Sequence, residues 1–138
     1  MLKNIYWLPL VLLTACADPI VMIPGGKLKG EVTAVPATWV SVPEVVQLET
    51  RPADPYSVNI WALTANGNLY FATDKAKWLE YITEDNRVRL RADNAIYELK
   101  AIQVTDETEI ASLVAAYKRK YDYDVDGSMG DAFRLTEH

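Results

Sequence analysis

The stretch SVNIWALTANGNLYFAT, residues 57–73, decides the fold of this chain. Two runs rich in β-branched and aromatic residues, 57–63 and 69–73, flank the tetrapeptide ANGN. The pair Asn66 and Gly67 readily adopts the positive φ angles that a two-residue hairpin turn of type I′ requires. The sequence therefore predicts an antiparallel β-hairpin whose turn is this Asn-Gly pair.

The segment that precedes the hairpin also favours a strand. Residues 45–50 alternate between apolar side chains, such as Val46 and Leu48, and polar ones, which is typical of a half-buried strand. The connection at 51–56 contains two prolines, which no central strand accommodates. We therefore expect an exposed loop between the first strand and the hairpin.

After the hairpin the pattern changes to helix and then returns to strand. Asp74 is placed as the N-cap of a short helix that runs to about Thr83. Residues 87–91 alternate basic and apolar, residues 93–94 favour a turn, and residues 96–104 return as a strand. A second hairpin is predicted here.

The last third of the chain predicts an amphipathic helix followed by a short strand. Asp106 and Glu109 have the spacing of a capping box, and basic residues 118–120 suit the negative end of the helix dipole. Apolar residues recur at helical spacing at Ile110, Leu113, Val114, Tyr117 and Tyr121. With a final strand at 132–135, the fold class is α+β and mainly β.

The amino terminus has the features of a bacterial lipoprotein signal peptide. Lys3 precedes an apolar run at 5–13, which is far shorter than the roughly 20 residues that span a bilayer. Small residues directly before Cys16 resemble a lipobox, which implies removal of residues 1–15 and attachment of diacylglycerol and a further acyl chain at Cys16. The alternative is an ordinary secreted protein with an exposed, unpaired thiol.

The expected location is the bacterial cell envelope. Ala17 after the lipidated cysteine favours the outer membrane facing the periplasm under the enteric sorting rule, although Asp18 weakens that rule in other bacteria. Residues 16–29 contain Pro and Gly without periodicity and are predicted to be a lipidated tether. Residues 30–138 are predicted to form one domain, and the lipid anchor is its expected contact with the membrane.

The composition argues against several classes of protein. With 14 Lys and Arg against 19 Asp and Glu, the formal net charge is −5, so nothing favours binding to nucleic acid or to anionic lipid head groups. The one histidine is His138 and the one cysteine is Cys16, so a histidine triad, a thiol nucleophile or a zinc site lacks its parts. Arg87, Arg89 and Arg91 share one strand face, which we interpret as the solvated side of the sheet rather than an anion site.

The acidic stretch DYDVDGSMGDAF, residues 122–133, begins like a calcium loop. Asp122, Asp124 and Asp126 occupy positions one, three and five of that template. Position twelve requires a bidentate Glu but is Phe133, and the residues around it favour a strand. We therefore predict a solvated loop without a tight metal site, with weak millimolar calcium binding as the alternative.

The run SVNIWALTANGNLYFATDKAKWLEYITEDNRVRLRADNAIYELKAIQV resembles the FMN-binding split-barrel superfamily, which includes pyridoxamine-phosphate oxidases and deazaflavin-dependent reductases. The resemblance covers about residues 45–121. PGGKLKGE at 24–31, together with VQLETRPADPYSVNIW, more closely resembles a subgroup of bacterial lipoproteins of unassigned activity that carry this barrel. The resemblance to the superfamily implies a split β-barrel with a short helix between the hairpins and an amphipathic helix near the carboxyl end. It also implies a homodimer.

The resemblance also implies a place for a flavin phosphate. In this superfamily, basic and hydroxyl side chains hold it at the end of the hairpin and the start of the following helix. The matching residues are Thr73, Lys75 and Lys77, with Arg51 as a partner from the first strand. A helix N-terminus adds backbone N–H donors, whereas Asp74 would repel the phosphate. The alternative is that both lysines are simply solvated.

Two residues of the first hairpin strand complete the candidate site. Trp61 is predicted on the strand face opposite Val58 and Ile60, where it could stack on an isoalloxazine ring or serve as ordinary core. Asn59 is a further candidate on the same strand.

Three functions from different classes follow. The chain is a lipid-anchored barrel that binds a small anionic or aromatic ligand, an interaction module without cofactor, or a periplasmic oxidoreductase dependent on FMN or deazaflavin. A protein exported unfolded must find its flavin outside the cytoplasm. We therefore rank the two binding functions above the enzyme, with no cofactor assigned.

Overall fold

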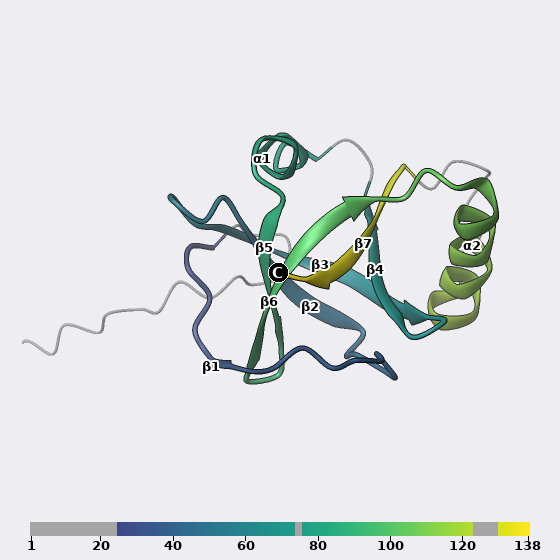
Figure 1. The fold of residues 1–138 in the computed structure, drawn as a ribbon, viewed down its shortest axis with the longest axis horizontal. Helices are drawn as coiled ribbons and strands as arrows, with labels where there is room; N and C mark the ends of the chain where they lie inside the picture. Colours follow the sequence, from purple (N-terminus) through teal and green to yellow (C-terminus); the bar gives the residue numbers. More distant parts are fainter. Residues whose placement is uncertain (1–24, 74–75, 123–129) are drawn as a thin grey trace, which may run out of the picture.

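The computed structural model describes residues 25–73, 76–122 and 130–138, and a closed six-stranded barrel forms its centre (Figure 1). The barrel strands are β2 (Val45–Thr50), β3 (Tyr56–Ala65), β4 (Asn68–Thr73), β5 (Arg87–Ala92), β6 (Ala95–Gln103) and β7 (Asp131–Glu137). Around the barrel the order is β5-β2-β3-β4-β7-β6, and β6 closes the ring by pairing with β5. Every pairing within this ring is antiparallel.

The alternation in the sequence fills the barrel with apolar side chains. Val46 and Leu48 of β2 point inward and are fully buried, while Gln47 and Glu49 lie on the outer face. The same core holds Ile60, Ala62, Leu69, Phe71, Val88, Leu90, Leu99, Ala101, Phe133 and Leu135 from the other five strands. The predicted strand at 45–50 and the mainly β fold class are confirmed.

The Asn-Gly turn forms as predicted. Asn66 has a φ of 52° and Gly67 a φ of 79°, and Ala65 pairs with Asn68 across the turn. The second predicted hairpin is also present as β5 and β6, with Asp93 at a φ of 54° in its turn. Local turn chemistry therefore set both hairpins.

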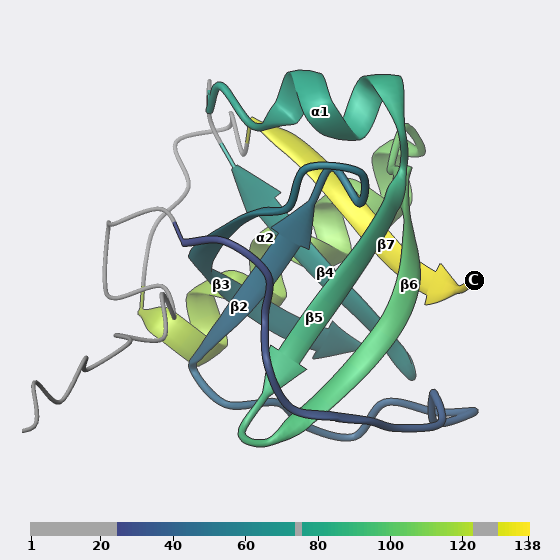
Figure 2. The same cartoon turned by 90° about the vertical axis from the view of Figure 1, so that its left-hand side faces the viewer.

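A short helix, α1 (Leu79–Glu84), covers one end of the barrel (Figure 2). The prediction that Asp74 caps this helix is wrong, because the N-cap residue is Trp78 and no side chain caps it. Turn-type bonds from Leu79 N–H to the Ala76 carbonyl and from Glu80 N–H to Lys77 lead the chain into the helix. The indole of Trp78, which is buried against Phe71, holds this entry in place.

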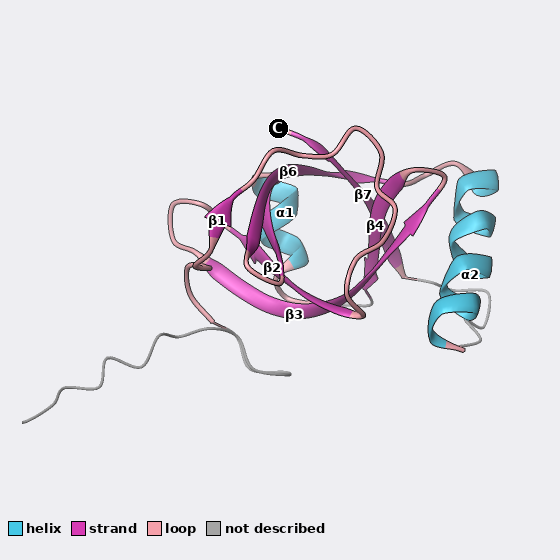
Figure 3. Cartoon of the chain, turned by 90° about the horizontal axis from the view of Figure 1, so that it is seen from below, coloured by secondary structure: helices cyan, strands magenta, loops and turns pink. Residues whose placement is uncertain are grey.

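The longer helix, α2 (Glu107–Tyr121), lies outside the ring of strands, as Figure 3 shows from below. Asp106 caps it as predicted, accepting hydrogen bonds from the Thr108 and Glu109 N–H groups. Glu109 does not complete a capping box, because its carboxylate instead accepts hydrogen bonds from the Tyr70 hydroxyl and from Arg134 of β7. An apolar cluster of Leu63, Tyr70, Val104, Leu113, Ala116, Tyr117 and Ala132 joins the helix to the barrel wall.

Residues 25–33, which we call the strap, cross the outer face of the barrel before the chain enters it (Figure 2). Leu28 is buried, and its N–H donates to the Glu49 carboxylate at 2.7 Å. Within the strap, β1 (Glu31–Val32) pairs in parallel with β6. Residues 25–29, which the sequence placed in the tether, are thus packed against the barrel.

The strap changes the environment of the arginine row on β5. Arg89 is partly buried, and its Nη1 lies 3.3 Å from the carboxylate of Glu49. Arg91 donates to Gln47 and to the Lys29 carbonyl. The interpretation that these arginines lie on the solvated side of the sheet therefore holds for Arg87, which is exposed. It is wrong for Arg89 and Arg91.

Several predictions lie outside the described residues. These are the signal peptide, Cys16, Lys75 and most of the acidic loop between α2 and β7. Phe133 lies in β7 with its ring stacked on Phe71 at 5.1 Å, so a strand follows that loop as predicted. Within the described ranges, no helix has the length and apolarity to cross a bilayer, and no group of three metal-ligating side chains gathers.

Candidate functional site

The candidate site lies where β3 changes its pairing partner. Residues 56–61 of β3 pair with β2, whereas residues 62–65 pair with β4. Beyond Phe71, the end of β4 pairs with β7 alone. The strands β3 and β4 therefore part at this point, and a groove opens between them.

The groove has a volume of about 410 Å³, within the range of about 300–1,000 Å³ typical of small-molecule sites. It is lined by Val45, Asn59, Ile60, Trp61, Ala72, Thr73 and Trp78. Most of this lining is apolar, and Asn59 and Thr73 supply polar groups at two strands. Such a lining suits a flat, largely apolar ring that carries a few hydrogen-bonding atoms.

The indole of Trp61 forms one wall of the groove and belongs to an aromatic pair. Trp61 is 48% exposed on the outer face of β3, so the interpretation of this residue as ordinary core is wrong. The ring of Tyr121 stacks on it with centroids 4.7 Å apart and planes 9° apart. Tyr121 covers one face of the indole, and a planar ring bound in the groove could extend the stack on the opposite face.

The hydroxyl of Tyr117 holds the two strands where they separate. It accepts a hydrogen bond from the Ala72 N–H at 2.8 Å and lies 3.4 Å from the Trp61 carbonyl, to which it donates. Burial raises the pKa of Tyr117, so the hydroxyl stays protonated and can fill both roles. The helix α2 thereby satisfies backbone groups that lost their ladder partners.

Two further contacts from side chains of α2 hold the backbone next to Trp61. The Tyr121 hydroxyl lies 2.7 Å from the carbonyl oxygens of both Glu44 and Ala62. The Lys120 ammonium donates to the same Ala62 carbonyl at 2.6 Å, and burial lowers the pKa of Lys120. These contacts orient the Tyr121 ring against the indole.

The structure brings together three of the six predicted cofactor residues. Asn59, Trp61 and Thr73 line the same groove. Arg51 lies elsewhere, because its guanidinium sits 4.2 Å from the centre of the Tyr81 ring and its side chain pairs with Asp54. A positive φ of 57° at Arg51 turns the chain away from β2 and explains this position.

Of the two predicted lysines, the structure describes Lys77, which does not line the groove. Lys77 is exposed in the turn before α1, next to the groove residue Trp78, and Lys75 lies outside the described residues. The phosphate-binding role of the two lysines therefore stays a prediction.

Four groove residues, Val45, Ile60, Ala72 and Trp78, were absent from the predicted site. Trp78 was overlooked in the short helix, although a Trp beside two lysines at the end of a hairpin is a signal for a ligand wall. Val45, Ile60 and Ala72 were predicted only as strand residues. Tyr121, which stacks on the groove residue Trp61, was predicted only as helix packing. Their roles depend on the parting of β3 and β4, which no local pattern reveals.

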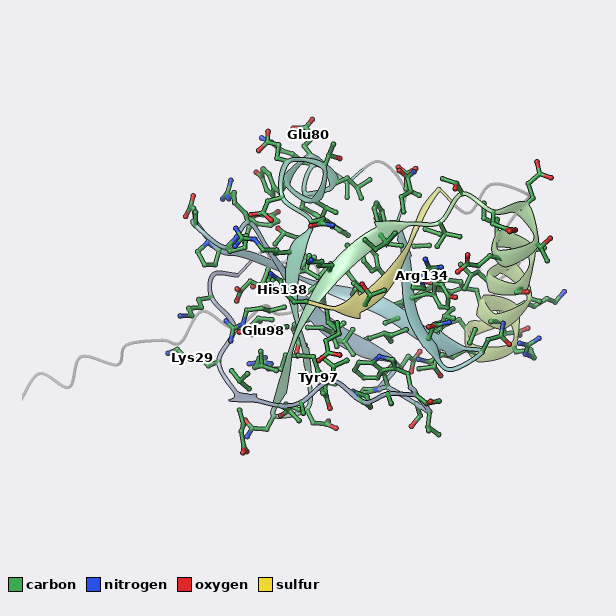
Figure 4. The ribbon with its side chains drawn as sticks, viewed as in Figure 1. Lys29, Glu80, Tyr97, Glu98, Arg134 and His138 are labelled. Atoms are coloured by element: carbon green, nitrogen blue, oxygen red, sulfur yellow. The ribbon has the colours of Figure 1, made fainter. Side chains whose placement is uncertain are left out.

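A second cavity, of about 230 Å³, is less suited to a ligand. Its lining includes Glu49, Arg87 and Arg89, together with Glu98 and His138, which lie near one another in Figure 4. Glu49 and Arg89 neutralise each other across the strands, and Arg87 pairs with Asp85 at 2.6 Å. Because Glu49, Arg87 and Arg89 already form ion pairs, the groove between β3 and β4 is the stronger candidate.

Solved structures share this architecture. An FAD-binding protein from Mesorhizobium loti matches with a TM-score of 0.53 at 14% identity, covering 71% of this chain and 83% of that one. A Listeria innocua protein assigned as a pyridoxamine 5'-phosphate oxidase matches with a TM-score of 0.56 at 12% identity, covering 68% and 83%. The fold is the split barrel. An F420-H2 dependent reductase matches with a TM-score of 0.50 at 16% identity, covering 70% and 99%.

A further solved structure, described as a domain-swapped dimer, matches with a TM-score of 0.52 at 15% identity, covering 70% of this chain and 83% of that one. No family model and no curated protein sequence matches the chain. At these identities the likeness concerns the fold, and the expected split barrel with its two helices is confirmed.

Proposed function

We propose that this split barrel binds a planar aromatic ligand of the flavin or deazaflavin type in the groove between β3 and β4. The observation that carries the proposal is the exposed indole of Trp61, which lines the groove and on which the Tyr121 ring stacks. Stacking on an aromatic wall with a few hydrogen bonds at the edge is a common way to hold such rings.

The residues present fit this kind of ligand. The groove is mainly apolar, and its polar groups belong to Asn59 and Thr73. The split barrels that resemble this chain include an FAD-binding protein and an F420-H2 dependent reductase, which supports the same ligand class here. When bound, such a ring system could accept or donate electrons, so turnover as an oxidoreductase is the alternative function.

The test is the visible absorption of the purified protein, followed by titration with FMN, riboflavin and a deazaflavin. We expect binding with quenching of the tryptophan fluorescence. Trp61→Ala should lose about five- to 150-fold in affinity, since stacking of a planar ring on an aromatic side chain is worth about 1–3 kcal/mol. Ile102→Ala, which removes another exposed apolar side chain from β6, should bind as the parent does. No binding of any of the three ring systems would refute the proposal.

Comparison of FMN with riboflavin also tests the predicted phosphate site. If Lys75 and Lys77 hold the phosphate, changing both to Ala should remove the preference for FMN and leave the affinity for riboflavin unchanged. Oxidation of a reduced nicotinamide or of a reduced deazaflavin by the loaded protein would favour the enzyme over the binding protein.

We further propose that the barrel is anchored in the bacterial envelope through lipid on Cys16, in the outer membrane facing the periplasm. The short apolar run that ends in small residues before Cys16 supports this proposal. Cys16→Ser should leave an uncleaved or mislocalised precursor that no longer incorporates labelled palmitate. Unchanged cleavage and unchanged partition into detergent would contradict the anchor.

A further inference from the structure

A row of three polar side chains crosses the outer face of the barrel and ends at the groove. Gln47 of β2 lies opposite Arg91 of β5 on one side and opposite Asn59 of β3 on the other. The Arg91 Nε donates to the Gln47 Oε1 at 3.0 Å, and the Gln47 Nε2 donates to the Asn59 Oδ1 at 3.1 Å. Arg91 is held in turn by the strap, since its Nη1 donates to the Lys29 carbonyl at 3.1 Å.

The chemistry of arginine fixes the direction of this row. A guanidinium has donors and no acceptor, so Gln47 must turn its carbonyl oxygen toward Arg91. The Gln47 NH₂ group then faces Asn59, which must present its own oxygen in return. The Asn59 NH₂ group therefore lies on the other side of the amide, toward the groove. Reversing either amide would place donors against donors.

We propose that Arg91 and Gln47 are positioning residues that fix Asn59 as a hydrogen-bond donor into the groove. The groove thereby selects planar ligands that carry an acceptor, either a carbonyl oxygen or an unprotonated ring nitrogen, at the edge next to β3. This selection rests on the proposed function, in which the ring stacks on Trp61.

The spacing along β3 makes one ligand able to reach both groups. Asn59 and Trp61 are two residues apart on the same face of the strand, which separates them by about 6.6 Å. A fused ring system stacked on the indole extends over this distance, so its edge meets the Asn59 amide. A ligand edge that carries only N–H groups would oppose the Asn59 donors and leave them unpaired, which costs binding energy.

Gln47→Glu should turn the Asn59 amide around without changing any residue that lines the groove. The new carboxylate still accepts from Arg91, but it cannot donate to Asn59. Asn59 must then turn its NH₂ group toward position 47 and its oxygen toward the groove. With riboflavin as the probe, which has no phosphate to be repelled, we expect the affinity to fall about tenfold or more. Asn59→Asp should have the same effect.

The matched control is Gln103→Glu on β6. The Gln103 Nε2 also donates to a side-chain oxygen, that of Asp131 at 3.1 Å, but Gln103 does not line the groove. This variant should bind riboflavin as the parent does. Equal riboflavin affinity in the parent, Gln47→Glu and Asn59→Asp would overturn the proposed selection.

Exchange of side-chain amide protons tests the orientation without a ligand. In the free protein, NMR should show slower exchange for the Gln47 NH₂ group than for that of Asn59, and in Gln47→Glu the Asn59 protons should become protected. Protected Asn59 protons in the parent would overturn the inference. If no flavin binds the parent but this exchange pattern holds, the proposed flavin ligand is refuted while the oriented donor stands.

Discussion

Gly67 is the residue of the β3–β4 turn whose backbone no other residue type adopts easily. Its φ is 79°, and its carbonyl accepts a hydrogen bond from the Trp39 N–H at 2.9 Å. A Cβ atom at this position would lie 3.0 Å from the Thr38 methyl group. The turn and the passing loop are thus fitted to a glycine.

We expect Gly67→Ala to lower the free energy of unfolding by about 1–2 kcal/mol, because a left-handed conformation costs that much for a residue with a Cβ atom. Urea denaturation measures the change. Gly26→Ala is the control, because a Cβ there meets nothing within 4 Å. Equal stability of the two variants would contradict this account of the turn.

Tyr121 makes the stability of the protein sensitive to alkaline pH. Burial, with a smaller contribution from Glu44, raises the pKa of Tyr121 from 10.0 to about 12. An unfolded tyrosine ionises near pH 10, so between about pH 10 and 12 the folded state keeps a proton that the unfolded state has lost. This contribution is complete below about pH 10 and is lost as the pH rises toward 12.

Tyr121→Phe removes this titration, so its unfolding free energy should fall less steeply than that of the parent above about pH 10. The variant should be less stable than the parent at neutral pH, because it lacks the hydrogen bonds to Glu44 and Ala62. Urea denaturation at several pH values gives both curves, and tyrosinate absorbance gives the pKa directly. Parallel curves would show that Tyr121 does not carry the effect.

The helix α2 is held to the barrel by one carboxylate as well as by its apolar face. Glu109 Oε1 accepts from the Tyr70 hydroxyl at 2.8 Å and from the Arg134 Nη1 at 2.6 Å. Both donors belong to the wall that α2 covers. This contact therefore sets where the helix docks on the barrel wall. It thereby also sets the positions of Tyr117 and Tyr121 beside the groove.

Glu109→Ala should destabilise the protein by about 1–3 kcal/mol, because it leaves a phenol and a guanidinium without their shared acceptor. Glu107→Ala is the matched control, since both acids lie in the first turn of α2 and lose the same interaction with the helix dipole, while Glu107 is exposed. Chemical denaturation compares the two. A similar loss in both variants would assign the effect to the dipole.

The elements that the sequence predicted best are those set by local chemistry. The alternation at 45–50, the Asn-Gly turn and the Asp106 cap each depend on neighbours within a few residues, and each is confirmed. The start of α1 was wrong because burial of Trp78 against Phe71, a tertiary contact, decided it. Residues 25–29 of the strap show no periodicity. Their packing depends on Glu49 and Ser57, which lie far along the chain.

The candidate site was predictable in part for the same reason. Asn59 and Trp61 share a strand face, and Thr73 ends the next strand, so the hairpin itself brings these three side chains near one another. The three-dimensional structure was needed for two other features of the site. One is the positive φ that directs Arg51 away from the groove, and the other is the stacking of Tyr121, which lies sixty residues after Trp61 in the chain. The amide direction at Asn59 likewise required the register of three strands.

The molecule as a whole leaves an apolar surface at the mouth of the groove. Trp61 and Val45 pair across β3 and β2 and are 48% and 39% exposed. Large exposed apolar side chains that lie together commonly mark an interaction surface. We expect this surface to join two copies of the chain.

We therefore expect a homodimer by sedimentation equilibrium at tens of micromolar, with the groove mouth in the interface. Val45→Asp should yield a monomer, because a buried carboxylate without a partner costs several kcal/mol at an interface. Val40→Asp is the matched control: Val40 is 85% exposed in the loop before β2, and its substitution should leave the dimer intact. If the parent sediments as a monomer, the predicted dimer is refuted. If the dimer persists in Val45→Asp and dissociates in another surface variant, the interface lies elsewhere on the molecule. In the expected case, each copy would close the groove of its partner and exclude water from the ring stacked on Trp61.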